Sequence, residues 1–200
     1  PTSMQMKTTG DMDGMAISAK IEGIGDEISD FLDETILFAS YATSKSNPDG
    51  LGGQTVMNME MASMMGSTDS ETGYSYWIGA QMPNMTGGKF GLEYNHGSKY
   101  WRPFTYGEDT LAGSKMAVRG DAYEAYWTQP LVGKAFSMQV RYTYMDYDYT
   151  GSDGFFGDGG TPMSMSEVKQ LNQFLTSIGQ ENMDTVETAQ DIRVYFRYKY

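Results

Sequence analysis

The sequence contains no cysteine, few basic side chains and no long apolar run. Without cysteine, a disulfide-stapled scaffold and a Cys-ligated zinc or iron–sulfur site are both excluded. Its 14 Lys and Arg stand against 26 Asp and Glu, for a net charge of −12. Non-specific nucleic-acid binding needs clustered positive charge, so we expect no nucleic-acid partner. No apolar run approaches the roughly 18 to 20 residues of a membrane-spanning helix.

Aromatic residues make up 14% of the 200 residues, and this content disfavours intrinsic disorder. By composition alone the chain is an ordinary soluble acidic domain. Strands that alternate polar and apolar side chains have the same average composition, however, when one face meets lipid and the other meets water. The pattern along the chain therefore decides between these two classes.

The C-terminal segment QDIRVYFRYKY alternates with a period of two, which predicts a strand with two different faces. Its apolar face consists of the aromatic and aliphatic residues Ile192, Val194, Phe196, Tyr198 and Tyr200. The other face holds Asp191, Arg193, Tyr195, Arg197 and Lys199. The segment is longer than the usual soluble strand of about five or six residues.

Six further segments are predicted to form strands, most of them by similar alternation. They are residues 14–24, 34–45, 74–81, 89–95, 115–128 and 136–144. Tilted strands of about ten residues cross a bilayer. We therefore predict an all-β fold, an antiparallel up-and-down transmembrane β-barrel or its C-terminal seven or eight strands.

The predicted connections alternate in length. Residues 83–88 and 129–134 form short turns, whereas 46–71, 97–114 and 149–187 are long. Such alternation puts all long loops at one end, as in outer-membrane barrels. Residues 46–71 hold four acids and no base, and 145–187 hold eight acids and one base, so most of the negative charge falls in loops.

A helix is predicted within the 149–187 loop at about 165–178, because Val168, Leu171, Leu175 and Ile178 share one helical face. All six prolines are expected in the terminus, turns or loops, since proline donates no ladder hydrogen bond.

Seven strands is an odd number, whereas bacterial single-chain barrels have an even number. Either residues 3–9 supply an eighth strand that closes a small barrel, or residues 1–200 are the last strands of a larger one, as one domain in both cases. The chain opens on Pro1 without an initiator methionine or a leader, which indicates either a processed product or a piece of a longer chain. The odd strand count favours the piece, so we expect the second arrangement.

The terminal strand resembles the signal by which the barrel assembly machinery recognises Gram-negative outer-membrane proteins. The stretches LEYNHGSKYWRPFTYGEDTLAGSK, RGDAYEAYWTQPL and RYTYMDYDYTGSDGFFG further resemble the C-terminal region of an uncharacterised, porin-like proteobacterial outer-membrane family, a domain of unknown function. The resemblance implies a location in the bacterial outer membrane with a periplasmic C-terminus. Its expected partners are the lipid bilayer, lipopolysaccharide and the assembly machinery, while the oligomeric state stays open.

The polar faces of the strands are expected to line a pore. The predicted pore-lining residues are Lys89, Glu93, Asn95, Glu124, Gln139, Arg141, Arg193, Arg197 and Lys199. Charges of both signs across a lumen orient dipolar solutes, so we predict a porin-like channel for small polar solutes. The alternative is a structural or surface-interaction protein without transport, in which these residues are solvated wall positions. Neither function involves a cofactor or catalysis.

A weaker alternative is a hydrolase on the lipid face. His96 and Ser98 lie two residues apart, a spacing similar to that of the outer-membrane phospholipases. Nucleophilic catalysis also needs a group that orients the imidazole, and the sequence names none. A histidine in an interfacial aromatic belt explains the same residues.

Two weak metal candidates are present, although no metal site is expected. Met57, Met59 and Met61 offer thioethers suited to Cu(I), yet they also alternate as an apolar face would. The carboxylates of Asp146, Asp148 and Asp153 could bridge divalent ions, but their spacing fits no EF-hand loop, and a solvated acidic surface explains them as well.

Overall fold

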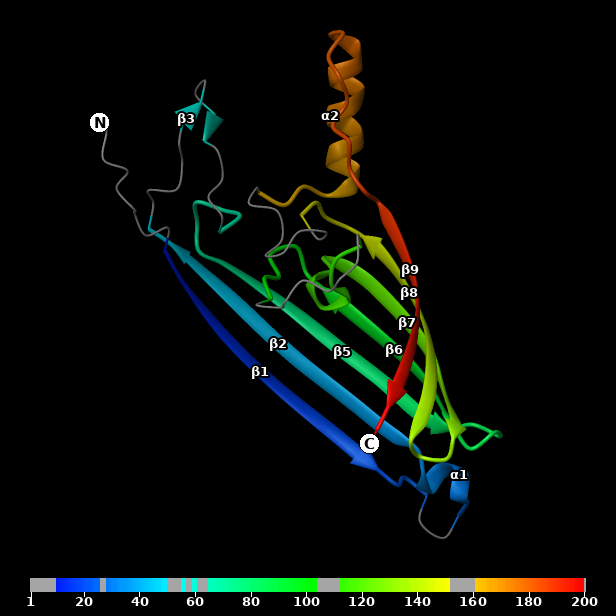
Figure 1. The fold of residues 1–200 in the computed structure, drawn as a ribbon. Helices are drawn as coiled ribbons and strands as arrows, with labels where there is room; N and C mark the ends of the chain where they lie inside the picture. The colour runs from blue at the N-terminus through cyan, green and yellow to red at the C-terminus, as the bar shows by residue number, and fades with distance from the viewer. Residues whose placement is uncertain are drawn as a thin grey trace, which may run out of the picture.

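A single antiparallel sheet dominates the computed structural model, which describes residues 10–25, 28–49, 55–56, 59–60, 65–103, 112–151 and 161–199. Within these ranges the sheet has seven strands, and each long strand pairs with the next one along the chain (Figure 1). The strands, in order, are β1 (Gly10–Glu22), β2 (Ile36–Pro48), β5 (Glu71–Pro83), β6 (Lys89–Gly97), β7 (Gly120–Val132), β8 (Phe136–Tyr147) and β9 (Thr188–Tyr198). A separate short hairpin consists of β3 (Thr55–Val56) and β4 (Met59–Glu60). The predicted all-β, antiparallel up-and-down arrangement is confirmed.

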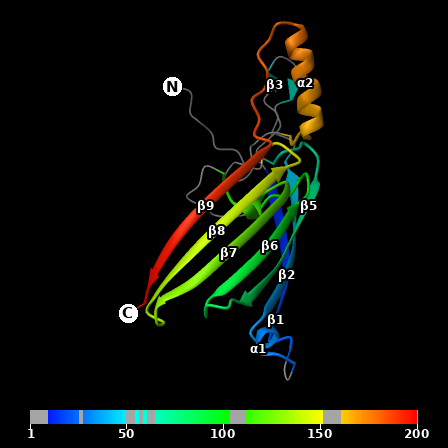
Figure 2. The same ribbon diagram turned by 90° about the vertical axis from the view of Figure 1, so that its right-hand side faces the viewer.

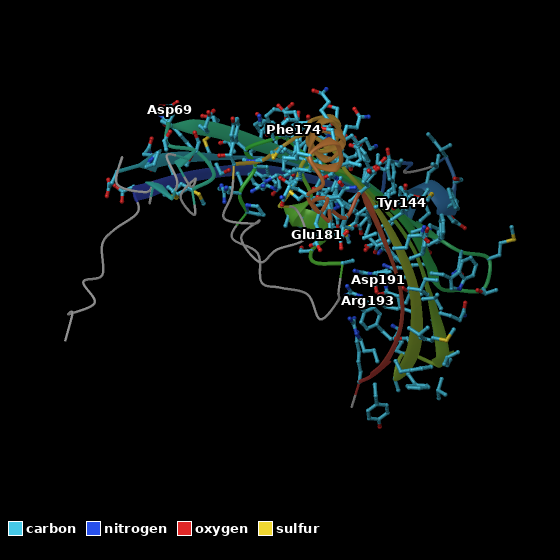
Figure 3. All side chains as sticks on the ribbon, turned by 90° about the horizontal axis from the view of Figure 1, so that it is seen from above. Asp69, Tyr144, Phe174, Glu181, Asp191 and Arg193 are labelled. Atoms are coloured by element: carbon cyan, nitrogen blue, oxygen red, sulfur yellow. The ribbon has the colours of Figure 1, made fainter. Side chains whose placement is uncertain are left out.

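The sheet is curved but not closed. Figure 2 shows the strands side by side as one tilted layer, and Figure 3 shows this layer bending into a trough when it is seen from above. Among the described residues, β1 and β9 each pair on one side only. The eighth strand considered for residues 3–9 lies outside the described residues. The described chain is therefore an open, curved wall rather than a complete barrel.

Several strand limits differ from the predicted ones. β7 begins at Gly120 instead of 115, because Lys115–Ala117 form the 3₁₀ turn η1. β7 also continues to Val132, so the turn predicted at 129–134 is shortened to 133–135.

The expectation that every proline avoids strands is wrong at three positions. Pro48 and Pro83 are the last residues of β2 and β5, and Pro130 lies where the register between β7 and β8 shifts. Strand ends and irregular pairs are the positions where a missing N–H costs least.

The register gives the wall two different faces. Directly opposite residues in antiparallel strands share a face, and Val194, Val140 and Trp127 form one such row across β9, β8 and β7. We call this side the apolar face and the opposite side the polar face. The exposed large side chains on the apolar face are Met15, Ile17, Ile21, Leu37, Tyr41, Tyr74, Ile78, Leu92, Tyr123, Trp127, Val140, Tyr142, Ile192, Val194, Phe196 and Tyr198.

Burial is the reverse of that in a soluble sheet. In β7 the polar-face residues Ala122, Glu124 and Tyr126 are buried, whereas Tyr123 and Trp127 of the apolar face are 47% and 41% exposed. Figure 3 agrees, because Asp191 and Arg193 lie on the hollow side of the trough and Tyr144 lies on its outer side. The polar face is thus the inner, concave one.

The short and the long connections lie at opposite ends of the sheet. The turns 84–88 and 133–135 and the short helix α1 (Asp30–Asp33) lie at one end, and β3, β4 and α2 lie at the other (Figure 1). Helix α2 (Met165–Ser177) falls within the predicted range and rises away from the sheet. No helix in the described ranges has the length and apolar character needed to cross a membrane.

Helix α2 begins at a capping box. The Ser164 hydroxyl accepts from the Glu167 N–H, and the Glu167 carboxylate accepts from the Ser164 N–H at 2.7 Å. The Ser164 N–H and hydroxyl both donate to the charged carboxylate and hold the pKa of Glu167 below its ordinary value. The returning segment pairs with the helix through Asn172, which bonds the backbone of Met183 in both directions. The helix is therefore anchored at its base and along one side.

We expect Gly91→Ala to destabilise the protein by about 1–3 kcal/mol, the usual cost of overpacking. Gly91 lies opposite Tyr126, and an added Cβ would be 2.1 Å from the Tyr126 Cζ atom. The ring would have to move, and its hydroxyl would lose the 2.9 Å bond from the Gln81 side chain. Equilibrium unfolding in denaturant measures the cost. Gly14→Ala is the matched control in β1, because its added Cβ meets nothing closer than 3.9 Å; an equal loss in both variants would contradict the prediction.

Candidate functional site

The residues predicted to line a pore lie together on the polar face. Lys89, Glu93 and Asn95 come from β6, Glu124 from β7, Gln139 and Arg141 from β8, and Arg193 and Arg197 from β9. Lys199 directly follows β9 and continues its alternation. Four neighbouring strands therefore bring these residues onto one surface.

Two acidic residues and one lysine form the centre of this surface. Glu93 and Glu124 lie directly opposite each other on β6 and β7. Like charges in that position repel, but Lys115 of η1 lies between them, with its Nζ 2.5 Å from Glu93 Oε2 and 2.6 Å from Glu124 Oε1. All three side chains are at most 12% exposed. The ammonium group is thus shared by two buried carboxylates and offsets one of their two negative charges.

Neighbouring side chains supply further donors to the two carboxylates. The Trp77 indole N–H donates to Glu93 Oε2 at 3.0 Å, and the Thr143 hydroxyl donates to Glu124 Oε2 at 2.9 Å. Arg141 lies 3.4 Å from Glu124 Oε1. Trp77 breaks the alternation of its strand in the sequence, and its bond to Glu93 explains a tryptophan on the polar face.

The segment between β6 and β7 carries Lys115 onto the polar face. The Trp101 indole donates to the Met116 carbonyl at 2.8 Å, and the Asn95 amide donates to the Lys115 carbonyl at 2.9 Å. Farther across the trough, the Arg102 N–H donates to the Ser44 hydroxyl of β2 at 3.0 Å. The described parts of the predicted long connection 97–114 therefore pack against the polar face, inside the trough. The polar groups of Asn95 and Ser44 provide the reason, because they bind the loop backbone.

Sequence reasoning missed Lys115, because it was assigned to a strand. Its alternation with Ala117 and its place just before β7 give no signal that it leaves the sheet. The available signal was the presence of Glu93 and Glu124 on two consecutive predicted strands. Two carboxylates on adjacent strands need a counter-charge.

A second ion pair lies near the loop end of β9. Arg193 pairs with Asp191 on its own strand, and its Nη1 donates to the Tyr195 hydroxyl at 3.1 Å. These residues lie at the edge of the described sheet.

Tyrosines and one histidine gather on the apolar face near the loop end. His96 Nδ1 lies 2.8 Å from Asp121 Oδ1, and the Tyr94 hydroxyl donates to the same oxygen at 2.6 Å. The His96 ring stacks on Tyr76 with centroids 5.1 Å apart. Asp121 is thus the orienting partner that the sequence did not reveal, because it comes from the neighbouring strand.

The Ser98 hydroxyl has a different partner from the one that catalysis needs. It accepts from the Tyr74 N–H at 2.8 Å, and in the described ranges no hydrogen bond joins it to His96. The hydrolase alternative therefore stays a prediction. The His96 imidazole has an orienting partner, but in the described residues it is not hydrogen-bonded to the Ser98 hydroxyl.

The weak metal candidates are mostly outside what the structure describes. Met57, Met61 and Asp153 lie outside the described residues, as does the Met59 side chain. Asp146 and Asp148 are both exposed residues. Partial desolvation of the Asp148 carboxyl, together with the nearby carboxylates of Asp121 and Asp146, raises its pKa. No group of three or more metal-ligating His, Asp or Glu side chains occurs in the described part of the chain.

The expected assembly signal lies on the free edge strand. Ile192, Val194, Phe196 and Tyr198 of β9 are exposed on the apolar face, and Tyr200 lies outside the described residues. Phe196 stacks on Phe136 of β8 with ring centroids 6.0 Å apart.

Comparison with known families gives one match, to a protein of unknown function, DUF3373, over residues 2–200. Comparisons with curated proteins and with solved structures give no match. The match confirms the expectation of an uncharacterised family. Because it covers almost the whole chain, this protein belongs to the DUF3373 family.

Proposed function

We propose that this chain forms part of the wall of a β-barrel in a bacterial outer membrane, and that its polar face lines a channel for small polar solutes. The observation that carries the proposal is the reversed burial of the sheet. Large apolar side chains are exposed together on the convex face, while charged and amide groups are buried on the concave face.

A bilayer explains the apolar face. Soluble monomers rarely expose contiguous apolar patches larger than a few hundred Å², and here the exposed residues span every strand of the described sheet. Ile17 at one edge is 70% exposed, and Ile192 at the other is 71% exposed. Hydrocarbon chains of lipid would cover this whole surface without a dedicated protein partner.

The proposal includes further strands that pair with β1 and β9. Each unsatisfied backbone group in hydrocarbon costs several kcal/mol, so a sheet edge does not stay open in a membrane. The curvature of the described wall suits closure around its polar face.

The two ends of the wall support an orientation. Short turns at one end and longer segments at the other are typical of outer-membrane barrels, with the turns in the periplasm. In this orientation β9 runs toward the periplasm, and its C-terminal end meets the assembly machinery there. The belt of Tyr74, Tyr76, Tyr94 and Tyr123 then lies at the outer interface, close to lipopolysaccharide.

A surface-interaction role is the second candidate, and α2 favours it. The helix stands outside the sheet, and its Phe174 and Ile178 side chains are 59% and 53% exposed. Such a helix could contact another molecule at the cell surface without any transport through the wall.

Thiol labelling during current recording tests the channel. The sequence has no cysteine, so Ser40→Cys on the polar face and Ala39→Cys on the apolar face each introduce one thiol of similar size. Both proteins are inserted in planar bilayers and exposed to a charged, membrane-impermeant thiol reagent. We expect the conductance of Ser40→Cys to fall while that of Ala39→Cys stays unchanged.

The other outcomes separate the candidates. A protein that inserts but carries no current contradicts the channel and favours the surface role. A protein that purifies as a soluble monomer without detergent contradicts the membrane wall itself.

A further inference from the structure

We propose that a recess on the polar face between β7, β8 and β9 binds a small solute through its carboxylate or phosphate group, with Arg141 and Arg197 as the anion-binding residues. The proposal rests on the channel function above, because it assigns a solute class to that channel.

The recess has the size and lining of a small-solute site. Its volume is about 310 Å³, at the lower end of the range for ligand pockets. Its polar lining comes from three adjacent strands and consists of Thr128, Ser137, Gln139, Arg141, Tyr195 and Arg197. Among the described residues no acidic side chain lines it, so the recess is electrostatically suited to an anion.

Arg141 is held in place by aromatic rings. Its guanidinium carbon lies 5.5 Å from the centroid of Tyr126 and 5.9 Å from that of Tyr195, which are distances for cation–π contacts. Its Nη1 faces Glu124 at 3.4 Å. Its Nε is buried and has no hydrogen-bond partner in the described residues. The wall of the recess thus contains a fixed N–H donor that lacks an acceptor.

Arg197 supplies a second positive charge to the same recess. It lies opposite Ser137 on β8, and no hydrogen bond or ion pair engages its guanidinium in the described part of the chain. Guanidinium groups bind carboxylate and phosphate oxygens in a bidentate manner. Because the Arg197 side chain is exposed, it can bind an anion that Arg141 already contacts.

The nearby carboxylates do not cancel the positive charge of Arg197. Lys115 and Arg141 together balance Glu93 and Glu124, and Glu124 also accepts from the Thr143 hydroxyl at 2.9 Å. The Tyr195 hydroxyl accepts from Arg193 Nη1 at 3.1 Å, so its own proton can be donated to a bound oxygen. Positive charge and hydrogen-bond donors therefore predominate in the recess.

Phosphate binding and phosphate current test this inference separately. The probe is inorganic phosphate, titrated against the detergent-solubilised protein and followed by broadening of the ³¹P resonance, while bilayers in potassium phosphate report current. We expect saturable binding and a current that saturates with phosphate concentration. Arg197→Gln should raise the half-saturation concentration of phosphate at least fivefold. Arg141→Lys should raise it as well, because lysine lacks the Nε donor although it keeps the positive charge.

Two controls sharpen the result. Lys169→Gln removes one positive charge from the exposed surface of α2, where Lys169 pairs with Glu187, and should leave both readouts unchanged. Acetate should displace phosphate if any small anionic group is recognised, whereas uncharged glycerol should not. Failure of acetate would restrict the site to phosphate groups.

The failures of the two proposals differ. If the protein conducts but does not bind phosphate saturably, the anion site is contradicted and the channel is not. The same holds if Arg197→Gln leaves phosphate binding unchanged. A protein that binds phosphate through Arg197 but carries no current supports the site and overturns the channel.

Discussion

Lysine in place of Val140 is expected to cost about 2–4 kcal/mol in the free energy of folding into a bilayer, whereas lysine in place of the adjacent Gln139 should cost little. Val140 lies on the apolar face near the middle of β8, and Gln139 lies on the polar face. A charge on the lipid-facing side near the bilayer midplane carries a penalty of this size, but a charge on the lumen side does not.

The two variants are matched, because the same residue is introduced at consecutive positions of one strand. Reversible unfolding in denaturant, in the presence of lipid vesicles, measures both free energies through tryptophan fluorescence. Comparable losses for both positions would mean that the apolar face does not meet lipid. A larger loss at Gln139 would reverse the assignment of the two faces.

Removal of the Lys115 ammonium should be the most damaging single change on the polar face. We expect Lys115→Met to cost about 3–5 kcal/mol, because breaking a buried ion pair leaves an uncompensated charge. Here Glu93 and Glu124 would face each other directly without their shared counter-ion. Equilibrium unfolding of the solubilised protein provides the free energy.

Restoration by a second change distinguishes charge from packing. Lys115→Met combined with Glu93→Gln removes one of the two opposing charges, so most of the lost stability should return. Lys99→Met, in the same connection, is the control, because among the described residues Lys99 lies 5.3 Å from the Tyr100 ring and forms no ion pair. If the double variant is as unstable as Lys115→Met alone, the methylene stem of Lys115 and not its charge stabilises the loop.

The faces of the wall could be predicted from sequence because alternation is a local property. The period of two in β8 and β9 assigns Val140 and Val194 to one side without any knowledge of the neighbours. The ends of the strands were harder to predict from sequence, because an alternating segment does not reveal where pairing begins. The η1 turn at Lys115 is an example.

Contacts between distant segments were beyond sequence reasoning. The bond between His96 and Asp121 depends on the register of β6 against β7, and the position of Lys115 depends on a loop that folds back into the trough. Neither is encoded in a spacing along the chain. Cross-strand pairs of this kind are specified by tertiary packing, which a single strand pattern does not contain.

The pairing of each long strand with its sequence neighbour has an evolutionary consequence. In the described sheet no strand crosses over another, so the backbone pairing of each hairpin with the rest of the sheet runs only along the outer edges of its two strands. A duplication or loss of one whole hairpin would leave every other register intact, provided that the alternation at the junction is kept. If the wall closes as proposed, such a change would alter its circumference by steps of two strands, and the width of the enclosed space would change independently of its lining chemistry.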